Sequence, residues 1–158
     1  MKNSIVYDKA KYHLGAENFP KNLLPVQAYV HTGMFLGWII DNNLFNKEFF
    51  DKLDIQKEIE GFRNRKISSI NIYQNQLDGV LTDEDLNEEG NAFAQDYFIF
   101  DKGRYIYDYM KVFRLKADQN YIIEDTWTNY EKIKEVIDKR YKDWKNKKSG
   151  NFWSRLFS

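Results

Sequence analysis

Apolar residues are most concentrated in one stretch of the chain, residues 25–42, which reads PVQAYVHTGMFLGWIIDN. A helix that is apolar on nearly all sides is either a core helix or a membrane span. The uninterrupted apolar part of this stretch is far shorter than the roughly 20 residues that a span needs. We therefore expect a buried central helix against which the rest of the chain packs.

The two sides of this central helix carry different residues. At about 100° per residue, His31 shares a side with Trp38, whereas Gly33 and Gly37 lie on the opposite side. A glycine in a helix interior costs about 1 kcal/mol relative to alanine, so some other contact must compensate for it. We therefore predict that a second helix approaches closely at the two glycines.

Most of the remaining chain shows apolar residues at the three- and four-residue spacing of a helix. The expected helices cover residues 7–13, 46–65, 69–77, 86–100 and 105–115, and a long last helix follows a cap at Asp125 or Thr128. Thr82 followed by Asp85 has the pattern of a capping box. No stretch of more than four residues alternates between apolar and polar positions as a strand does. We predict an all-α fold, a compact single-domain bundle of about six to eight mostly short helices around the buried central helix.

The length of 158 residues suits one domain with a sizeable core. We expect residues 1–148 to form a single helical domain and residues 149–158 to form an aromatic and basic C-terminal tail. The apolar residues between Phe152 and Phe157 are expected to pack on the core. Contact with a membrane surface or with a partner is the alternative, because basic residues beside aromatic ones favour both.

Composition narrows the classes of function. The formal net charge is zero at pH 7, which argues against a nucleic-acid partner that needs a basic surface. The absence of cysteine excludes disulfides and thiolate zinc sites, and the presence of only two histidines argues against a histidine-rich metal site. We accordingly expect no metal, no cofactor and no transmembrane segment. The N-terminus lacks the apolar run of a signal peptide, so we expect a cytoplasmic location.

An acidic segment extends from residue 78 to residue 101 without a single lysine or arginine. Its candidates for binding a basic partner are Asp83, Glu84, Asp85, Glu88 and Glu89. Acidic residues also gather at helix N-termini, where they complement the helix dipole, and this explanation accounts well for the first three. The length of the whole run favours a partner surface instead, because like charges repel one another.

Residues 74–85 resemble a calcium-binding loop only in their second half. Calcium loops of this type usually carry carboxylates at their first positions, whereas this chain has the uncharged Gln74 and Gln76 at the first and third positions. We therefore interpret this segment as a turn followed by a helix cap, which needs no ion.

His31 is the one feature of the central helix that is typical of an enzyme. The simplest interpretation is a buried neutral imidazole whose N–H is paired with a nearby oxygen. The alternative is a pocket formed by His31, Trp38, Glu124, Asp125 and Trp127, in which a carboxylate orients the imidazole. Motifs of nucleophile elbows, phosphate loops and dinucleotide sites are absent from the sequence, so we expect a protein that is not an enzyme.

Three sequence blocks carry a resemblance to a known type of protein: HTGMFLGW at residues 31–38, LTDEDLNEEGNAFA at residues 81–94 and EDTWTNY at residues 124–130. Together they resemble an uncharacterised bacterial family of domains of unknown function, associated with immunity proteins encoded near polymorphic toxins. The resemblance supplies no catalytic residues. It implies a binding protein. It marks as signature positions His31, Trp38, the acidic residues from Asp83 to Glu89, Asn91, Glu124, Asp125 and Trp127.

These observations favour a non-enzymatic immunity protein that neutralises a cognate toxin by direct binding. Its expected partner is a basic toxin domain, steered by the acidic segment and anchored by tyrosine and tryptophan. Two alternatives stay open. One is a small enzyme or ligand-binding domain with a pocket near His31, and the other is a structural homo-oligomer joined through the aromatic tail.

Overall fold

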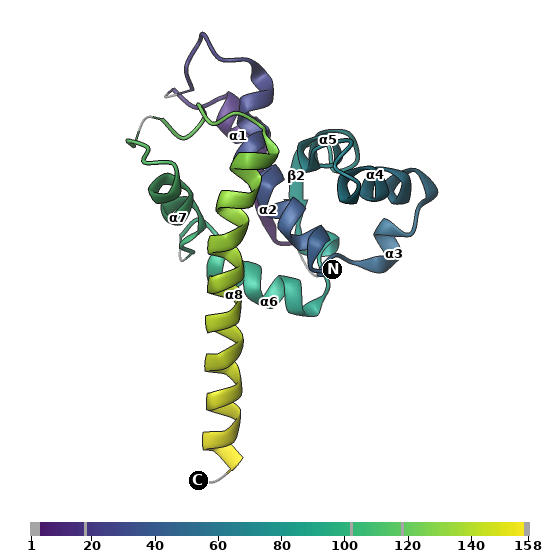
Figure 1. Ribbon diagram of the computed structural model, residues 1–158, viewed down its shortest axis with the longest axis vertical. Coiled ribbons are helices and arrows are strands. Elements are labelled where there is room, and N and C mark those ends of the chain that lie inside the picture. The colour runs from purple at the N-terminus through teal and green to yellow at the C-terminus, as the bar shows by residue number, and fades with distance from the viewer. Residues whose placement is uncertain (1–3, 18, 102, 118, 157–158) are drawn as a thin grey trace.

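The computed structural model describes residues 4–17, 19–101, 103–117 and 119–156 (Figure 1). Helices dominate these ranges, and two short strands accompany them, so the predicted all-α fold is correct only in its helical part. The elements in chain order are β1 (Val6–Lys9), α1 (Ala10–Leu14), the 3-10 helix η1 (Pro25–Tyr29), α2 (Val30–Asp41), α3 (Lys47–Phe50), α4 (Leu53–Arg63), α5 (Ser69–Asn75), β2 (Val80–Thr82), the 3-10 helix η2 (Asp83–Asp85), α6 (Glu88–Tyr97), α7 (Tyr105–Val112) and α8 (Trp127–Leu156).

The prediction of a helix over residues 7–13 is wrong in its first half. Strand β1 occupies that part and pairs antiparallel with β2, with Val6 opposite Thr82 and Lys9 opposite Val80. The register shifts between Val6 and Asp8. A four-residue strand is too short to show alternation, and its backbone partners lie far away in sequence, so local spacing could not reveal it.

The central helix is buried over most of its length, as predicted, although Pro25 and Val26 at its start are exposed. The 3-10 helix η1 forms the first turn, which Pro25 opens, and α2 continues it. Every residue from Val30 to Ile40 is buried. Phe35 of this helix stacks on Phe98 with ring centroids 4.3 Å apart, and this stacking covers the side of α2 that carries His31.

The predicted close approach at the two glycines of α2 is confirmed. A Cβ atom built on Gly33 would lie 2.5 Å from Ile70 Cγ1, and one built on Gly37 would lie 2.7 Å from Ser69 Oγ. Both neighbours belong to α5, so α5 packs directly on the backbone of α2. The energy that this packing recovers offsets the low helix propensity of glycine.

Side-chain caps mark the start of several helices. Asn46 accepts a hydrogen bond from the backbone N–H of Glu48 at the start of α3, as its type suggests. Thr82 and Asp85 form the predicted capping box, although the element that they open is η2 and not α6. The cap of α8 is Thr126, which accepts from the backbone N–H of Asn129, in place of the predicted Asp125 or Thr128.

Helix α8 is the longest element, and its N-terminal half lies on the body of the domain while its C-terminal half projects away from it (Figure 1). Its face toward the domain carries an apolar stripe, with Tyr130, Ile133 and Ile137 buried. The helix continues through Leu156, so no helix end marks the predicted boundary between residues 148 and 149. The side chains from Phe152 to Phe157 lie outside the described residues, and the role of this tail stays a prediction.

None of the helices in the part of the chain that the structure describes combines the length and the apolar character that crossing a bilayer requires.

Candidate functional site

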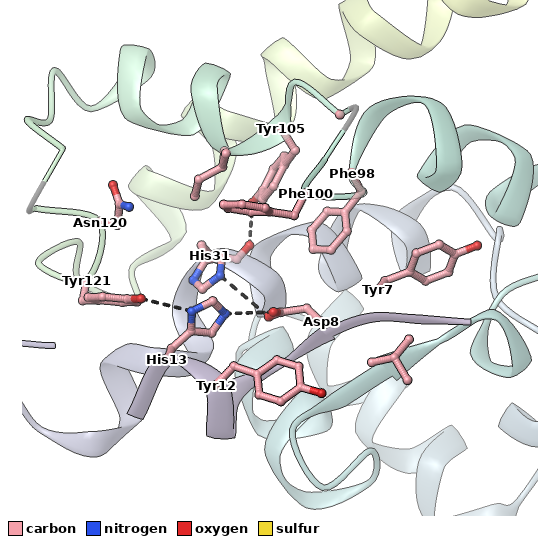
Figure 2. A pocket seen from close by; sticks show the side chains of 13 residues that line it. Tyr7, Asp8, Tyr12, His13, His31, Phe98, Phe100, Tyr105, Asn120 and Tyr121 are labelled. Atoms are coloured by element: carbon pink, nitrogen blue, oxygen red, sulfur yellow. Dashed lines mark hydrogen bonds and ion pairs between the residues drawn. The ribbon is translucent and has the colours of Figure 1, made fainter. Parts of the chain in front are cut away.

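A cavity of about 550 Å³ opens between β1, α1, the start of α2 and the segments on either side of α7 (Figure 2). Its walls are mainly aromatic, with side chains from Tyr7, Tyr12, Phe98, Phe100, Tyr105 and Tyr121. A volume of this size with apolar walls and a few polar groups is typical of a small-molecule site. This cavity is therefore the candidate site.

Three polar side chains meet on one side of the cavity and form what we call the Asp8–His13–His31 cluster. His13 Nε2 lies 2.8 Å from Asp8 Oδ1, and His31 Nε2 lies 3.7 Å from Asp8 Oδ2. The rings of His13 and His31 meet edge to face with centroids 4.5 Å apart. The three residues come from β1, α1 and α2 respectively, and the β1–β2 pairing holds Asp8 in place.

The carboxylate of Asp8 is held from several sides. The Thr32 hydroxyl donates to Oδ2 over 2.5 Å, and the Tyr73 hydroxyl lies 3.5 Å from the same oxygen. Burial by itself would raise the pKa of Asp8, but the hydrogen bond from His13, the electrostatic influence of the two neighbouring imidazoles and the hydrogen bond from Thr32 together outweigh it. The net pKa of Asp8 is therefore lowered, and the group is ionised at pH 7.

His31 is buried, and burial lowers its pKa to about 4 because the charged imidazolium loses its hydration. The imidazole is therefore neutral at pH 7, as the simplest interpretation of the sequence expects. Its Nδ1 atom, however, has no hydrogen-bond partner among the residues that the structure describes. Asn120 also lines the cavity. Its Oδ1 atom is likewise buried and has no hydrogen-bond partner among the described residues.

His13 links the cluster to the opposite wall. Its Nδ1 lies 3.0 Å from the Tyr121 hydroxyl, so Asp8, His13 and Tyr121 form a chain of hydrogen bonds (Figure 2). Burial raises the pKa of Tyr121, with a smaller contribution from the charge of Asp8. The hydroxyl of Tyr121 therefore stays protonated and is a poor nucleophile.

A family model described as a domain of unknown function (DUF7832) matches residues 6–123, more than half of the chain. The chain belongs to this family. No curated protein and no solved structure matches the chain. The matched range contains the complete Asp8–His13–His31 cluster and Tyr121, whereas α8 begins after it.

The DUF7832 match bears on the three sequence blocks in different ways. Residues 31–38 and 81–94 lie inside the matched range, and residues 124–130 lie beyond its end. The family description states no activity and no toxin association. The link to immunity proteins therefore stays a proposal.

Of the five residues predicted to form a pocket, only His31 lines the cavity. Trp38 is fully buried on the same helix, and its indole N–H donates to Asp138 of α8 over 2.7 Å. Asp125 and Trp127 line a separate space of about 30 Å³. Glu124 is exposed and contributes its backbone carbonyl to Asn129. Helical spacing placed Trp38 on the same side of α2 as His31, but about two turns of helix separate the two residues and carry Trp38 past the cavity.

The residues that lie beside His31 in the cavity do not belong to any recognisable sequence motif. Asp8 lies in the strand that spacing does not predict, and Tyr121 lies in the loop before α8. The one available signal is His13, because it is the second of only two histidines in the chain. Two histidines together with one carboxylate are enough for a compact cluster, which a count of histidines alone does not suggest.

Three of the five acidic candidates, Asp83, Asp85 and Glu89, form contacts within the fold. Asp83 accepts from the Ser4 hydroxyl and the Ile5 backbone N–H, both at 2.8 Å. Asp85 is buried within the capping box, and burial raises its pKa. Glu89 bonds the Tyr141 hydroxyl and lies 3.0 Å from Lys145 Nζ, and the hydrogen bond from Tyr141 is the main cause of its lowered pKa.

Glu84 and Glu88 are the two acidic candidates that differ from the other three. Both side chains are exposed, and neither forms an ion pair among the described residues. These two carboxylates are therefore the acidic candidates with the fewest contacts inside the fold, and the acidic partner surface stays a prediction.

Proposed function

We propose that this member of the DUF7832 family is a binding domain for a small planar ligand, held in the cavity beside the Asp8–His13–His31 cluster. The observation that supports this most is the combination of an aromatic cavity of about 550 Å³ with polar groups gathered on one side. Binding sites for small molecules have this composition, because apolar walls supply affinity and a few polar groups fix orientation.

The rim of the cavity supports the same proposal. Tyr12 is 63% exposed and Phe100 is 81% exposed, although both contribute to the cavity wall. Covering apolar surface yields about 25 cal/mol per Å². Two exposed rings at the mouth of an aromatic cavity are therefore placed to close over a flat molecule and to gain from doing so.

The polar groups indicate what such a ligand carries. Asp8 is an ionised acceptor, and Asn120 Oδ1 is a second acceptor that lacks a partner among the described residues. His31 Nδ1 also lacks one. A buried polar atom without a partner costs about 1–3 kcal/mol, which a ligand group can recover. We therefore propose a planar heteroaromatic compound with at least one N–H or amino donor.

Saturation-transfer-difference NMR with planar heteroaromatic amines tests the proposed ligand class. Aliphatic amines of the same size serve as the comparison, and EDTA is present throughout so that metal ions play no part. We expect heteroaromatic amines to bind and the aliphatic ones to give no signal. The substitution Ile106→Trp fills the cavity from its wall and is expected to weaken binding at least about tenfold.

The matched control is Ile122→Trp, because Ile122 is 43% exposed and does not belong to the cavity wall. This variant should bind as the unchanged protein does. Equal binding by the Ile106→Trp and Ile122→Trp variants, or equal binding of aliphatic and aromatic amines, would contradict the proposed site.

Neutralisation of a basic toxin domain is the second candidate function. The observation in its favour is that Glu84 and Glu88 are exposed and lie free of ion pairs among the described residues. Charges that are not compensated within the chain can steer a partner of opposite sign.

Charge reversal tests this second candidate once a basic partner is in hand. The double substitution Glu84→Lys and Glu88→Lys is expected to slow association about tenfold at low salt and to flatten its salt dependence. The control is the double substitution Asp54→Lys and Glu60→Lys on α4. Both side chains are exposed and lie outside the acidic segment. Association rates that are equal for both double variants would exclude the acidic segment from partner binding.

A further inference from the structure

We infer that the Asp8–His13–His31 cluster is a binding site for one divalent transition-metal ion of the zinc type. The inference goes beyond the proposed ligand, and neither depends on the other. It also revises the expectation of no metal, because two imidazoles and one carboxylate form a complete set of three protein ligands.

The donor atoms have the required spacing. One ligand atom from each of the three residues lies within 4.8 Å of the other two. In a tetrahedral site with bonds of about 2.1 Å, donor atoms are about 3.4 Å apart. The two separations within the cluster, 2.8 Å from His13 Nε2 to Asp8 Oδ1 and 3.7 Å from His31 Nε2 to Asp8 Oδ2, lie on either side of that value. An ion would therefore require small side-chain adjustments, and it would replace the hydrogen bond between His13 and Asp8.

The choice of metal follows from the donor types. Two nitrogen donors with one carboxylate suit Zn²⁺, Fe²⁺ and Co²⁺, whereas Ca²⁺ and Mg²⁺ prefer sites made of oxygen alone. Three protein ligands also leave a coordination position open, and all three proposed ligands line the cavity. The site therefore has the composition of a reactive or ligand-accepting metal site more than that of a closed structural one.

The surroundings hold the ligands as metal sites require. With Nε2 bound to the ion, His13 Nδ1–H donates to the Tyr121 hydroxyl, 3.0 Å away. The Thr32 hydroxyl fixes Asp8 Oδ2. Such outer contacts set the tautomer and the orientation of the ligands and contribute strongly to affinity.

His31 provides an independent observation. It is only 6% exposed, and its Nδ1 has no partner among the described residues. Its Nε2 is 3.7 Å from Asp8, too far for a good hydrogen bond. The fold thus buries an imidazole beside a carboxylate without pairing either nitrogen well. A cation between Nε2 and Asp8 accounts for this burial, because it supplies the missing bond.

Titration with metal alone tests the site. The full chain, without a histidine tag, is stripped with EDTA, dialysed, and titrated with Zn²⁺ by calorimetry and with Co²⁺ by visible absorption. We expect one ion per chain and intense d–d bands of low-coordinate Co²⁺. Because both histidines of the chain belong to the cluster, imidazole NMR signals report on this site alone, and Zn²⁺ must shift both sets.

Variants separate the site from adventitious binding. Asp8→Asn is expected to weaken Zn²⁺ binding at least about 100-fold and Tyr121→Phe about tenfold. Tyr107→Phe is the matched control, since Tyr107 is 57% exposed and does not line the cavity, and it should leave the affinity unchanged. Thermal unfolding of each variant without metal checks that it is folded.

Two results would overturn the inference. One is the absence of Zn²⁺ and Co²⁺ binding to the folded, unchanged protein. The other is Zn²⁺ binding that leaves the NMR signals of either imidazole unshifted. This measurement uses the unchanged protein, so it decides the question even if the Asp8→Asn variant does not fold. Since the amine measurements contain EDTA and these contain no amine, failure of the metal site and failure of the ligand proposal are distinguishable.

Discussion

Replacing Gly33 and Gly37 together by alanine is expected to lower the free energy of unfolding by about 2–4 kcal/mol. A Cβ atom on Gly33 would lie 2.5 Å from Ile70 Cγ1 and 3.1 Å from Ile70 Cα, so the backbone of α5 would have to move. On Gly37 it would also lie 3.0 Å from a ring atom of Tyr130 in α8. The gain of about 1 kcal/mol in helix propensity at each position does not offset this overpacking.

The control is Gly61→Ala in α4, where the new Cβ atom would meet only the Ile67 side chain, at 3.3 Å or more. That substitution is expected to change stability by less than about 1 kcal/mol, in the stabilising direction. Urea-induced unfolding measures all three proteins. If the double variant and the control have the same midpoint, the close packing of α5 on α2 does not contribute to stability as described.

Substituting Arg140 by methionine is expected to have the second large effect, a loss of about 2–4 kcal/mol. Asp108 is 3% exposed, and Arg140 binds both its oxygens, through Nε at 2.7 Å and a terminal nitrogen at 2.8 Å. Removing one partner of a buried pair leaves an uncompensated charge, which costs about 3–5 kcal/mol. We expect somewhat less here, because Arg140 is 34% exposed and water can reach the carboxylate.

A double-mutant cycle separates the charge from the packing. Adding Asp108→Asn to Arg140→Met removes the unpaired charge and should recover part of the lost stability, since Tyr97 can still donate to residue 108. The matched control is Lys145→Met, whose partner Glu89 is exposed, and this change should cost less than about 1 kcal/mol. A loss of stability as large in Lys145→Met as in Arg140→Met would contradict the special role of the buried pair.

The Asp108–Arg140 pair also has a topological role. Asp108 belongs to the range that matches the DUF7832 family, whereas Arg140 belongs to α8 outside that range. Trp38 and Asp138 form a second such link, and Tyr130 with Asp41 a third. Three buried or half-buried polar contacts therefore attach α8 to the matched part, in addition to the apolar stripe of the helix.

Helix α2 shows how much of the fold the sequence predicts. Its apolar run, its buried character and the close approach at Gly33 and Gly37 all follow from local spacing, because the periods of a helix can be read within a few turns. The same is true of the caps at Asn46 and Thr82, since a cap is a contact between residues two or three positions apart. These features need no knowledge of the remaining chain.

The two-stranded sheet and the candidate site show the opposite case. Strand β1 forms because residues 80–82 provide its backbone hydrogen-bond partners. The sequence of residues 6–9 does not by itself predict that pairing. The site needs this strand, since β1 carries Asp8 to the end of α1 and the start of α2. Glu124 and Asp125, which local reasoning offers as partners of His31, belong to a different part of the surface.

The sequence by itself determined a mainly helical domain with a buried central helix, and it singled out His31 on that helix. Those properties depend on hydrophobic periods and capping residues, which are short-range. Only the tertiary structure decided that His31 lies beside Asp8 and His13 at an aromatic cavity, and that Asp83, Asp85 and Glu89 support the fold. These outcomes depend on contacts between residues far apart in sequence, because burial and electrostatics depend on what lies nearby in space.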